Sequence, residues 1–235
     1  MNLRKIAFDY VKSEFIEKDI DIILLQEVQN LQKNQSDLFD YLDEKGYRIF
    51  YSDHSLNGHW NIAILVKKSL INESYGKTVD KVTGKYSSTR WMCYEFILPH
   101  NQKMTIINIY ANPADVPGIF RSKNTKHGYD KFREELEEKV NGDGFVIVAG
   151  DLNIDLRYRL TTSAFPYLNS ILINCIKDPI WTRFPWQDDH ILINQKLQFE
   201  LKGKIEYKVC NCLDAEEMVR KYSDHIPLEV IIDFD

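Results

Sequence analysis

The sequence predicts an α/β fold in which two β-sheets pack face to face with helices on their outer sides. Segments with helical spacing alternate with short apolar runs in both halves of the chain, and two consecutive strands flank a polar turn in the middle. The 235 residues are 44% hydrophobic, which is enough to bury one substantial core. No repeat, low-complexity tract or Gly/Ser/Pro linker marks a boundary, so we expect a single domain over 1–235.

In the first third of the chain, segments whose apolar residues have helical spacing alternate with short apolar runs typical of strands. Apolar residues near the N-terminus recur with the spacing of a helix that buries one face, and the next apolar run is typical of a buried strand. Ser36 suits the N-cap of a second helix, and Gly46 suits its end. The predicted elements are helix 3–16, strand 22–25, the helix from Ser36 to about Gly46, and strands 47–51 and 61–66.

The middle and the last third contain more strands. Two strand-like segments flank the polar turn 99–103, and a helical segment then leads to the apolar run Phe-Val-Ile-Val-Ala that begins at Phe145. The loop 111–127 carries two prolines and a glycine, and long loops in compact domains are often functional. The predicted elements are strands 90–98 and 104–110, helix 129–140, strand 145–149, helix 165–173, and strands 190–193, 199–209 and 226–232.

Charge and cysteine content limit the class of protein. The net charge of −5 and the pI near 5.7 show no basic footprint for nucleic acid. A nuclease is disfavoured but not excluded, because a divalent cation can supply local positive charge. The cysteines show no disulfide or zinc-finger spacing, no apolar run approaches the ~18 residues needed to span a bilayer, and the N-terminus lacks a signal core. We therefore expect a cytoplasmic protein with reduced thiols.

The stretch FVIVAGDLN, from Phe145 to Asn153, combines a buried strand with chemistry at its end. A glycine follows the apolar run, and Asp151 and Asn153 then stand two residues apart. In extended chain, residues two apart point to the same side, so a carboxylate and an amide would emerge together at a sheet rim. Gly, Asp and Asn also dominate ordinary turns, so this stretch alone leaves a plain turn equally open.

Two further stretches also place polar or charged side chains next to an apolar strand. Ile-Ile-Leu-Leu, ending at Leu25, runs into Gln26 and Glu27, and Ser223-Asp224-His225 leads into the C-terminal strand. In the order LQE, GDLN and SDH, nearly the whole chain resembles the endonuclease/exonuclease/phosphatase superfamily, whose fold is that of deoxyribonuclease I. The resemblance implies a four-layer α-β-β-α sandwich of two mixed sheets, with these three stretches converging at one edge.

The resemblance implies a metal site. Glu27 matches the metal-binding glutamate, and Asp224 is a second candidate ligand. A hard anionic oxygen is what Mg²⁺ prefers, and Mn²⁺ can take the same place. Without the family pattern, a solvated strand end is the more common role for a residue such as Glu27.

His225 is the histidine that the resemblance selects, and Asp189 matches the aspartate that orients it. Asp188 is the close competitor for that role. His190 is expected to lie on the alternate face of its strand. The other histidines stand in polar, loop-like sequence, where an exposed side chain is the ordinary interpretation.

Three more residues are weaker candidates. Tyr110 and Asn112 resemble the Tyr-x-Pro-Asn turn of the apurinic-site endonuclease branch, with proline and asparagine exchanged. The resemblance implies a catalytic role for Tyr110 and phosphate binding by Asn112. Arg90 stands where several family members keep a phosphate-binding arginine, and a guanidinium matches phosphate geometry. An ordinary strand-end aromatic is an equally common role for Tyr110.

One feature departs from the pattern. The family usually begins with a strand that ends in an active-site asparagine, often after a tryptophan, whereas this sequence starts with the following helix. We expect the reading frame upstream of Met1 to encode such a strand.

These observations predict a Mg²⁺-dependent hydrolase of phosphate esters. Asp151 would orient or deprotonate the attacking water, Asn153 and His225 would donate to phosphoryl oxygens, and Asp189 would fix His225. Phosphodiesters of DNA or RNA are the first choice of substrate because of the tyrosine-bearing turn. The alternatives are a phosphomonoesterase acting on a nucleotide, inositol phosphate or lipid head group, and a non-catalytic binding or scaffold protein on the same fold.

Overall fold

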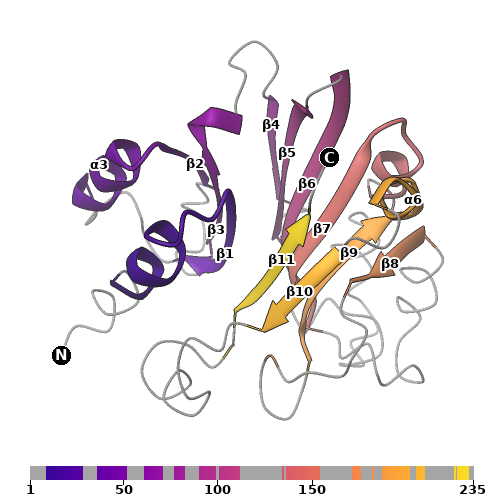
Figure 1. The fold of residues 1–235 in the computed structure, drawn as a ribbon. Helices are drawn as coiled ribbons and strands as arrows, with labels where there is room; N and C mark the ends of the chain where they lie inside the picture. The colour runs from indigo at the N-terminus through magenta and orange to yellow at the C-terminus, as the bar shows by residue number, and fades with distance from the viewer. Residues whose placement is uncertain are drawn as a thin grey trace.

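The structure is a computed structural model, and it has the predicted sandwich architecture (Figure 1). It describes residues 9–28, 36–51, 61–70, 77–82, 90–98, 101–111, 134, 136–153, 171–175, 182, 187–201, 205–209, 225 and 227–232. Two layers of strands face each other across an apolar interior, and helical segments lie on their outer sides. The predicted four-layer α-β-β-α fold is therefore confirmed.

The larger sheet has the strand order β4-β5-β6-β7-β9-β8 within the described part of the chain. Strands β6 and β7 pair in parallel, and the other neighbours are antiparallel, so the sheet is mixed as predicted. Its strands are β4 (Lys77–Val82), β5 (Arg90–Leu98), β6 (Gln102–Tyr110), β7 (Phe145–Asp151), β8 (Leu172–Asn174) and β9 (Asp189–Asn194).

The opposite layer is built from two smaller antiparallel sheets among the described residues. One has the order β1-β3-β2, and the other pairs β10 with β11. In Figure 1, β10 and β11 lie in front of the larger sheet. The strands are β1 (Ile22–Val28), β2 (Tyr47–Tyr51), β3 (Asn61–Lys67), β10 (Ile205–Val209) and β11 (Leu228–Ile232).

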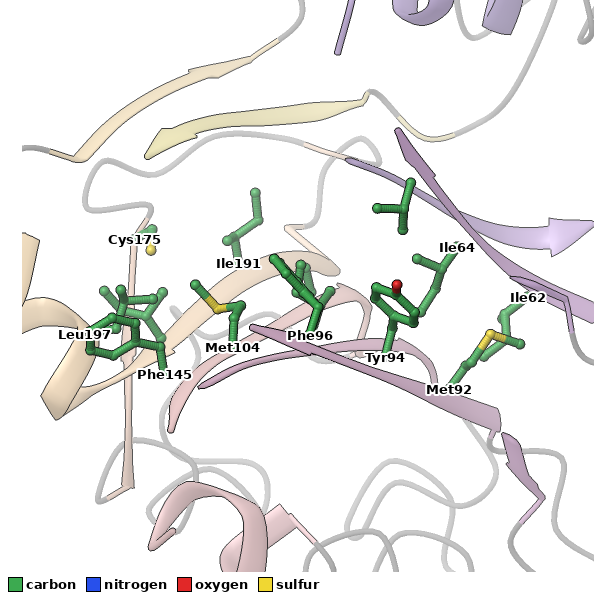
Figure 2. Packing of buried hydrophobic residues seen from close by; sticks show 14 of the residues in the cluster. Ile62, Ile64, Met92, Tyr94, Phe96, Met104, Phe145, Cys175, Ile191 and Leu197 are labelled. Atoms are coloured by element: carbon green, nitrogen blue, oxygen red, sulfur yellow. The ribbon is translucent and has the colours of Figure 1, made fainter. Parts of the chain in front are cut away.

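The main core lies between the two layers (Figure 2). Alternate residues of each strand point inward, and both layers contribute, as Ile64 of β3, Tyr94 of β5 and Ile191 of β9 illustrate. Burial of apolar surface on both inner faces stabilises the pairing of the layers. This pairing brings β1 against β6 and β7, the strands that carry most of the candidate site.

Helical segments cover the outer faces. Residues 9–11 and the π-helix η1 (Lys12–Ile16), with helix α3 (Ser36–Glu44), cover the smaller layer, and Ile16 and Leu42 are buried against β1 to β3. Helical residues 134 and 136–140 cover the larger sheet through Leu136. None of the described helices is long and apolar enough to cross a membrane.

Two predicted elements are wrong. The segment 199–209 was expected to be one strand, but it contains the end of helix α6 (Gln195–Leu201) and then β10. The backbone amide of Leu197 donates to Asn194 Oδ1 at 3.1 Å, which caps the helix, and Leu197 and Leu201 bury one face. The predicted helix 165–173 ends instead in strand β8, because pairing with β9 satisfies its backbone; residues 165–170 lie outside the described residues.

Candidate active site

Four candidate residues from four adjacent strands stand in one row across the larger sheet. Arg90 pairs in register with Tyr110, Tyr110 with Asp151, and Asp151 with Asp189. Residues directly opposite on neighbouring strands lie about 5 Å apart. The sheet register therefore gathers positions that are up to 99 residues apart in the sequence (189 − 90 = 99) at one end of the sandwich.

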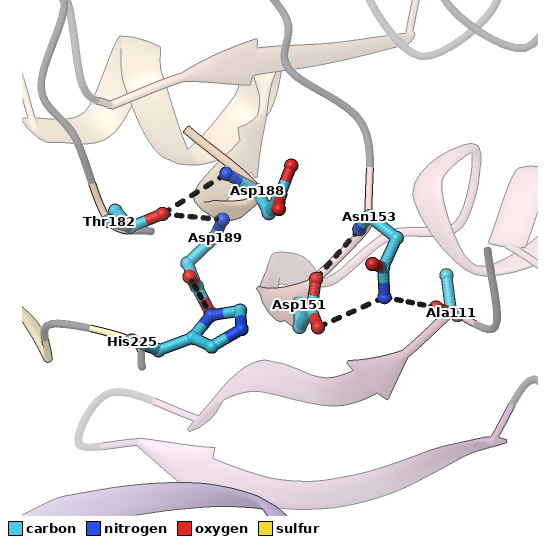
Figure 3. A network of polar contacts seen from close by, with 7 residues as sticks. All are labelled: Ala111, Asp151, Asn153, Thr182, Asp188, Asp189 and His225. Atoms are coloured by element: carbon cyan, nitrogen blue, oxygen red, sulfur yellow. Dashed lines mark hydrogen bonds and ion pairs between the residues drawn. The ribbon is translucent and has the colours of Figure 1, made fainter. Parts of the chain in front are cut away.

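Asp151 is held by Asn153 and by the chain around it (Figure 3). The Asn153 backbone amide donates to Asp151 Oδ1 at 2.7 Å, and Asn153 Nδ2 donates to Oδ2 at 3.0 Å. Asn153 Nδ2 also donates to the carbonyl oxygen of Ala111 at 2.6 Å. Asn153 has a φ of 49°, in the left-handed region that asparagine tolerates better than most residues. Both Nδ2 hydrogens are thus used within the protein, whereas the sequence predicted donation to a phosphoryl oxygen.

The Asp151 carboxyl group is only 5% exposed. Burial, followed by the nearby Asp189 carboxylate, raises its pKa to about 8, although His225 and the amide of Asn153 act in the opposite direction. At neutral pH this carboxyl group retains a proton when no cation is bound. A cation bound nearby would favour the ionised form of Asp151.

Asp189 and His225 form the predicted contact. Asp189 Oδ2 lies 2.7 Å from His225 Nδ1, and the two side chains are 13% and 24% exposed. Figure 3 shows the imidazole ring beside Asp189, on the side of the site where Asp151 lies. When Nδ1 carries the proton, it donates to Asp189, and the carboxylate fixes the orientation of the ring.

The competitor Asp188 takes a different position. The backbone amides of Asp188 and Asp189 both donate to the hydroxyl oxygen of Thr182, at 3.1 and 3.0 Å. The carbonyl oxygen of Asp188 accepts from the Leu152 amide at 2.9 Å. Strand alternation places His190 on the other face from Asp189, as expected, whereas Asp188 stands just before the strand. The role of Thr182 was not foreseen, because no sequence pattern marks it.

Glu27 stands in a bulge at the end of β1. Leu25 pairs with Ala63 and Val28 with Asn61, so Gln26 and Glu27 together face the single residue Ile62. Glu27 is exposed and has a φ of 55°. Bulges of this kind re-aim side chains and are common beside active sites. The nearby Gln26 Nε2 would lie 3.1 Å from a Cβ at residue 150, so the end of β1 lies beside the residue that precedes Asp151.

The donor set fits a hard divalent cation. Glu27 offers an exposed carboxylate, and Asp151 is a buried carboxyl group whose pKa is raised first by burial and then by the Asp189 carboxylate. Within the described residues, no three His, Cys, Asp or Glu side chains gather closely enough to hold a metal by themselves. The second predicted ligand, Asp224, and the predicted phosphate-binding residue Asn112 lie outside the described residues, as does the side chain of Arg90.

Solved structures share this architecture at low sequence identity. An endonuclease/exonuclease/phosphatase family protein from Leptotrichia buccalis C-1013-b matches with a TM-score of 0.68 and 16% identity, over 100% of this chain and 95% of that chain. A 3' phosphatase from Neisseria, bound to a product DNA hairpin, matches with a TM-score of 0.64 and 16% identity, over 99% and 95%. A Cimex nitrophorin matches with a TM-score of 0.52 and 12% identity, over 94% and 90%.

The sequence comparisons give the family. No curated protein matched the chain. A sequence model described as the Endonuclease/Exonuclease/phosphatase family matches residues 2–225, which is most of the chain and includes the stretches around Glu27, Asp151 and His225. Because the match spans almost the whole sequence and the fold agrees with it, this chain belongs to the endonuclease/exonuclease/phosphatase family.

Proposed function

We propose that this chain is a Mg²⁺-dependent phosphoesterase that hydrolyses phosphodiester bonds of DNA or RNA. The observation that carries the proposal is the pairing of a buried Asp151, oriented by Asn153, with a His225 oriented by Asp189. A positioned carboxylate and a positioned imidazole are what general base and electrostatic catalysis require. The family includes nucleases and phosphatases, which supports the reaction class.

Each residue has a distinct part in the proposed reaction. Asp151 orients the attacking water and takes its proton, while Asn153 fixes both carboxylate oxygens. His225 donates through Nε2 to a phosphoryl oxygen, and Asp189 holds the ring in that orientation. Glu27 and Asp224 would hold the cation, which when bound would polarise the phosphoryl group and stabilise the leaving oxygen.

Of the remaining candidates, Tyr110 would take part in catalysis, and Arg90 and Asn112 would bind the phosphate. Arg90 and Tyr110 continue the backbone row that contains Asp151, so they stand next to the reacting group. Asn112 follows Ala111, whose carbonyl oxygen accepts from Asn153.

A phosphomonoesterase is the second candidate. The net charge of −5 offers little attraction to a long polyanion and suits a small phosphorylated substrate or a terminal phosphate. The similarity to a 3' phosphatase bound to a DNA hairpin supports the same alternative. The metal, water and phosphate contacts would be unchanged, and only the substrate's leaving group would differ.

The test is a substrate screen with purified protein. Plasmid DNA, RNA, oligonucleotides with a 3' phosphate, and nucleotide, inositol and lipid-head-group phosphomonoesters are incubated with Mg²⁺ or Mn²⁺, with and without EDTA. We expect hydrolysis that EDTA abolishes and that falls by at least ~10²-fold in Asp151→Ala and His225→Ala. Metal-independent hydrolysis, or an Asp151→Ala protein as active as the parent, would sink this mechanism.

A matched pair tests the choice of aspartate. Asp189→Asn should lose activity by at least ~10-fold with little change in stability, because it weakens the contact that orients His225. Asp188→Asn should retain most of the activity, because the backbone of Asp188, which this substitution keeps, makes the contacts with Thr182 and Leu152. The reverse order would show that Asp188 is the orienting residue.

The same screen tests the alternative that this chain is a binding or scaffold protein and not an enzyme. The likeness to a nitrophorin shows that this fold serves other roles, so a binding or scaffold protein is the alternative to an enzyme. A chain that folds, binds Mn²⁺ and cleaves none of these substrates would support that alternative.

A further inference from the structure

A buried amide links the two layers directly behind the candidate site. Asn108 lies near the end of β6, is 0% exposed, and stands between Ile106 and Tyr110 on the inward face. The strand is otherwise apolar at inward positions, and an apolar side chain would fill this space without a desolvation cost. A buried amide at this position therefore needs hydrogen-bond partners for its donors and its acceptor, and these partners show which segments Asn108 joins.

The three hydrogen bonds of Asn108 all reach the opposite layer. Asn108 Nδ2 donates to the carbonyl oxygen of Leu25 on β1 at 3.0 Å and to that of Ala63 on β3 at 2.9 Å. Its Oδ1 accepts from Gln26 Nε2 at 2.6 Å. We call Gln26 and Asn108, with these bonds, the amide clamp. It fastens β1 to the larger sheet at the residues that open the bulge.

The neighbouring strand leaves room for this clamp. Gly150 of β7 has a φ of +133°, and a Cβ there would lie 3.1 Å from Gln26 Nε2 and 2.1 Å from the carbonyl oxygen of Ile109. Only glycine fits this space. The Gln26 side chain therefore lies against both Asn108 of β6 and Gly150 of β7, which brings the end of β1 to the end of β7.

The clamp also accounts for the backbone of Glu27. A non-glycine residue with a φ of 55° costs on the order of 1 kcal/mol and persists only where its surroundings hold it. Slippage of a strand by one residue turns each of its side chains to the other face. Because Asn108 bonds the backbone of Leu25 and the side chain of Gln26, it fixes the register immediately before Glu27.

We propose that Gln26 and Asn108 are positioning residues, and that the amide clamp sets the direction of the Glu27 carboxylate for a divalent cation. This inference rests on the proposed function in that it assigns Glu27 to the cation. The clamp residues themselves need not touch cation or substrate. Groups of this kind, which orient a metal ligand, typically change metal affinity by about 10- to 100-fold when they are removed.

The larger sheet offers a matched control at its other end. Asn194 is a buried asparagine of β9 that also makes three hydrogen bonds: its Oδ1 accepts from the amides of Val146 and Leu197, and its Nδ2 donates to the Gly144 carbonyl oxygen. Loss of Asn194 should destabilise the fold to a similar degree as loss of Asn108. It is connected to neither Glu27 nor β1.

The experiment measures metal binding by the whole chain. The dissociation constant for Mn²⁺ is determined by calorimetry, and the rise in Tm with Mg²⁺ by thermal denaturation, for the parent, Gln26→Met, Asn108→Ala and Asn194→Ala. We expect Gln26→Met and Asn108→Ala to bind Mn²⁺ about 10- to 100-fold more weakly, and Asn194→Ala to bind within ~2-fold of the parent. Saturating Mn²⁺ should restore most of the kcat of Gln26→Met.

The outcomes separate this inference from the proposed function. Parent-like Mn²⁺ affinity in Gln26→Met, or an equal loss in Asn194→Ala, would overturn the clamp as a positioning device. Gln26→Met, which keeps the length of the side chain, decides the matter if Asn108→Ala does not fold. A parent that binds Mn²⁺ without hydrolysing any substrate contradicts the proposed function alone, and weaker binding in Gln26→Met would still support the clamp. A parent that binds no divalent cation overturns both.

Discussion

At the scale of single residues, the candidate site keeps a carboxyl group in an environment that disfavours its charge. Asp151 is buried beside Asp189, and these two causes raise its pKa from 3.8 to about 8. Residues arranged for chemistry are often costly to stability, because the reaction needs a charge or geometry that the fold alone would not select.

The consequence is a stability that depends on pH in a defined window. Between about pH 4 and pH 8 the unfolded chain has released the Asp151 proton and the metal-free folded chain retains it, so stability falls as pH rises, by at most about 1.4 kcal/mol per unit. Asp151→Asn cannot ionise. Its Tm advantage over the parent in EDTA should therefore grow from pH 4 to pH 8 and then level off.

Thermal denaturation across that range checks this prediction. Asn194→Ala, which changes no ionisable group, supplies the control and should show a constant difference from the parent. A Tm difference for Asp151→Asn that stays flat between pH 4 and pH 8 would mean that the Asp151 carboxyl group ionises normally in the folded protein.

The left-handed backbone at Glu27 predicts that glycine is more stable than alanine at this position. Because its φ is 55°, Glu27→Gly should be more stable than Glu27→Ala by about 1 kcal/mol. Glu206 is an exposed residue of β10 whose φ is not positive. It should show the opposite order, with the glycine variant less stable than the alanine variant. Urea denaturation of the four variants measures both differences. The same sign at both positions would contradict the bulged geometry of Glu27.

At the scale of elements, the approach of β7 to β6 is the tightest described feature near the site. Gly150→Ala places a Cβ 2.1 Å from the Ile109 carbonyl oxygen, so the parallel ladder would have to open. We expect a loss of about 3 kcal/mol or more. Gly46, with a φ of +79° and nothing within 4 Å of its Cβ position, is the control, and Gly46→Ala should cost only about 1 kcal/mol. Similar costs in urea denaturation would exclude a close approach at Gly150.

At the scale of the whole molecule, the two layers bring the end of β1, with Glu27, beside Gly150 and the carboxyl groups of Asp151 and Asp189. A cation at this end of the sandwich would bind the folded chain and raise its Tm. It competes with the Asp151 proton, so Mg²⁺ should stabilise the parent more at pH 9 than at pH 6, with the apparent affinity falling by up to about tenfold per pH unit below 8. Asp151→Asn should lose most of this pH dependence. Equal Tm shifts at both pH values in the parent would show that no cation binds near Asp151.

The sequence by itself determined the fold class, most strands and the choice of Asp189 over Asp188 as the neighbour of His225. Period-two and helical patterns report burial directly, so the strands around Ile64 and Val148 were predictable from their neighbours alone. Helix α6 was mistaken for a strand because its decisive feature is the Asn194 cap, a contact that an apolar pattern does not record.

Tertiary structure alone decided how the chemical groups meet. The row from Arg90 to Asp189 exists because β5, β6, β7 and β9 pair in one register, which depends on backbone hydrogen bonds between distant segments. The amide clamp of Gln26 and Asn108 was equally hidden, although a polar residue within an apolar strand was a visible sign. A sequence lists donors and acceptors one at a time, whereas the geometry of a site is set by long-range packing that joins residues such as Leu25, Asn108 and Gly150 only after the layers have closed.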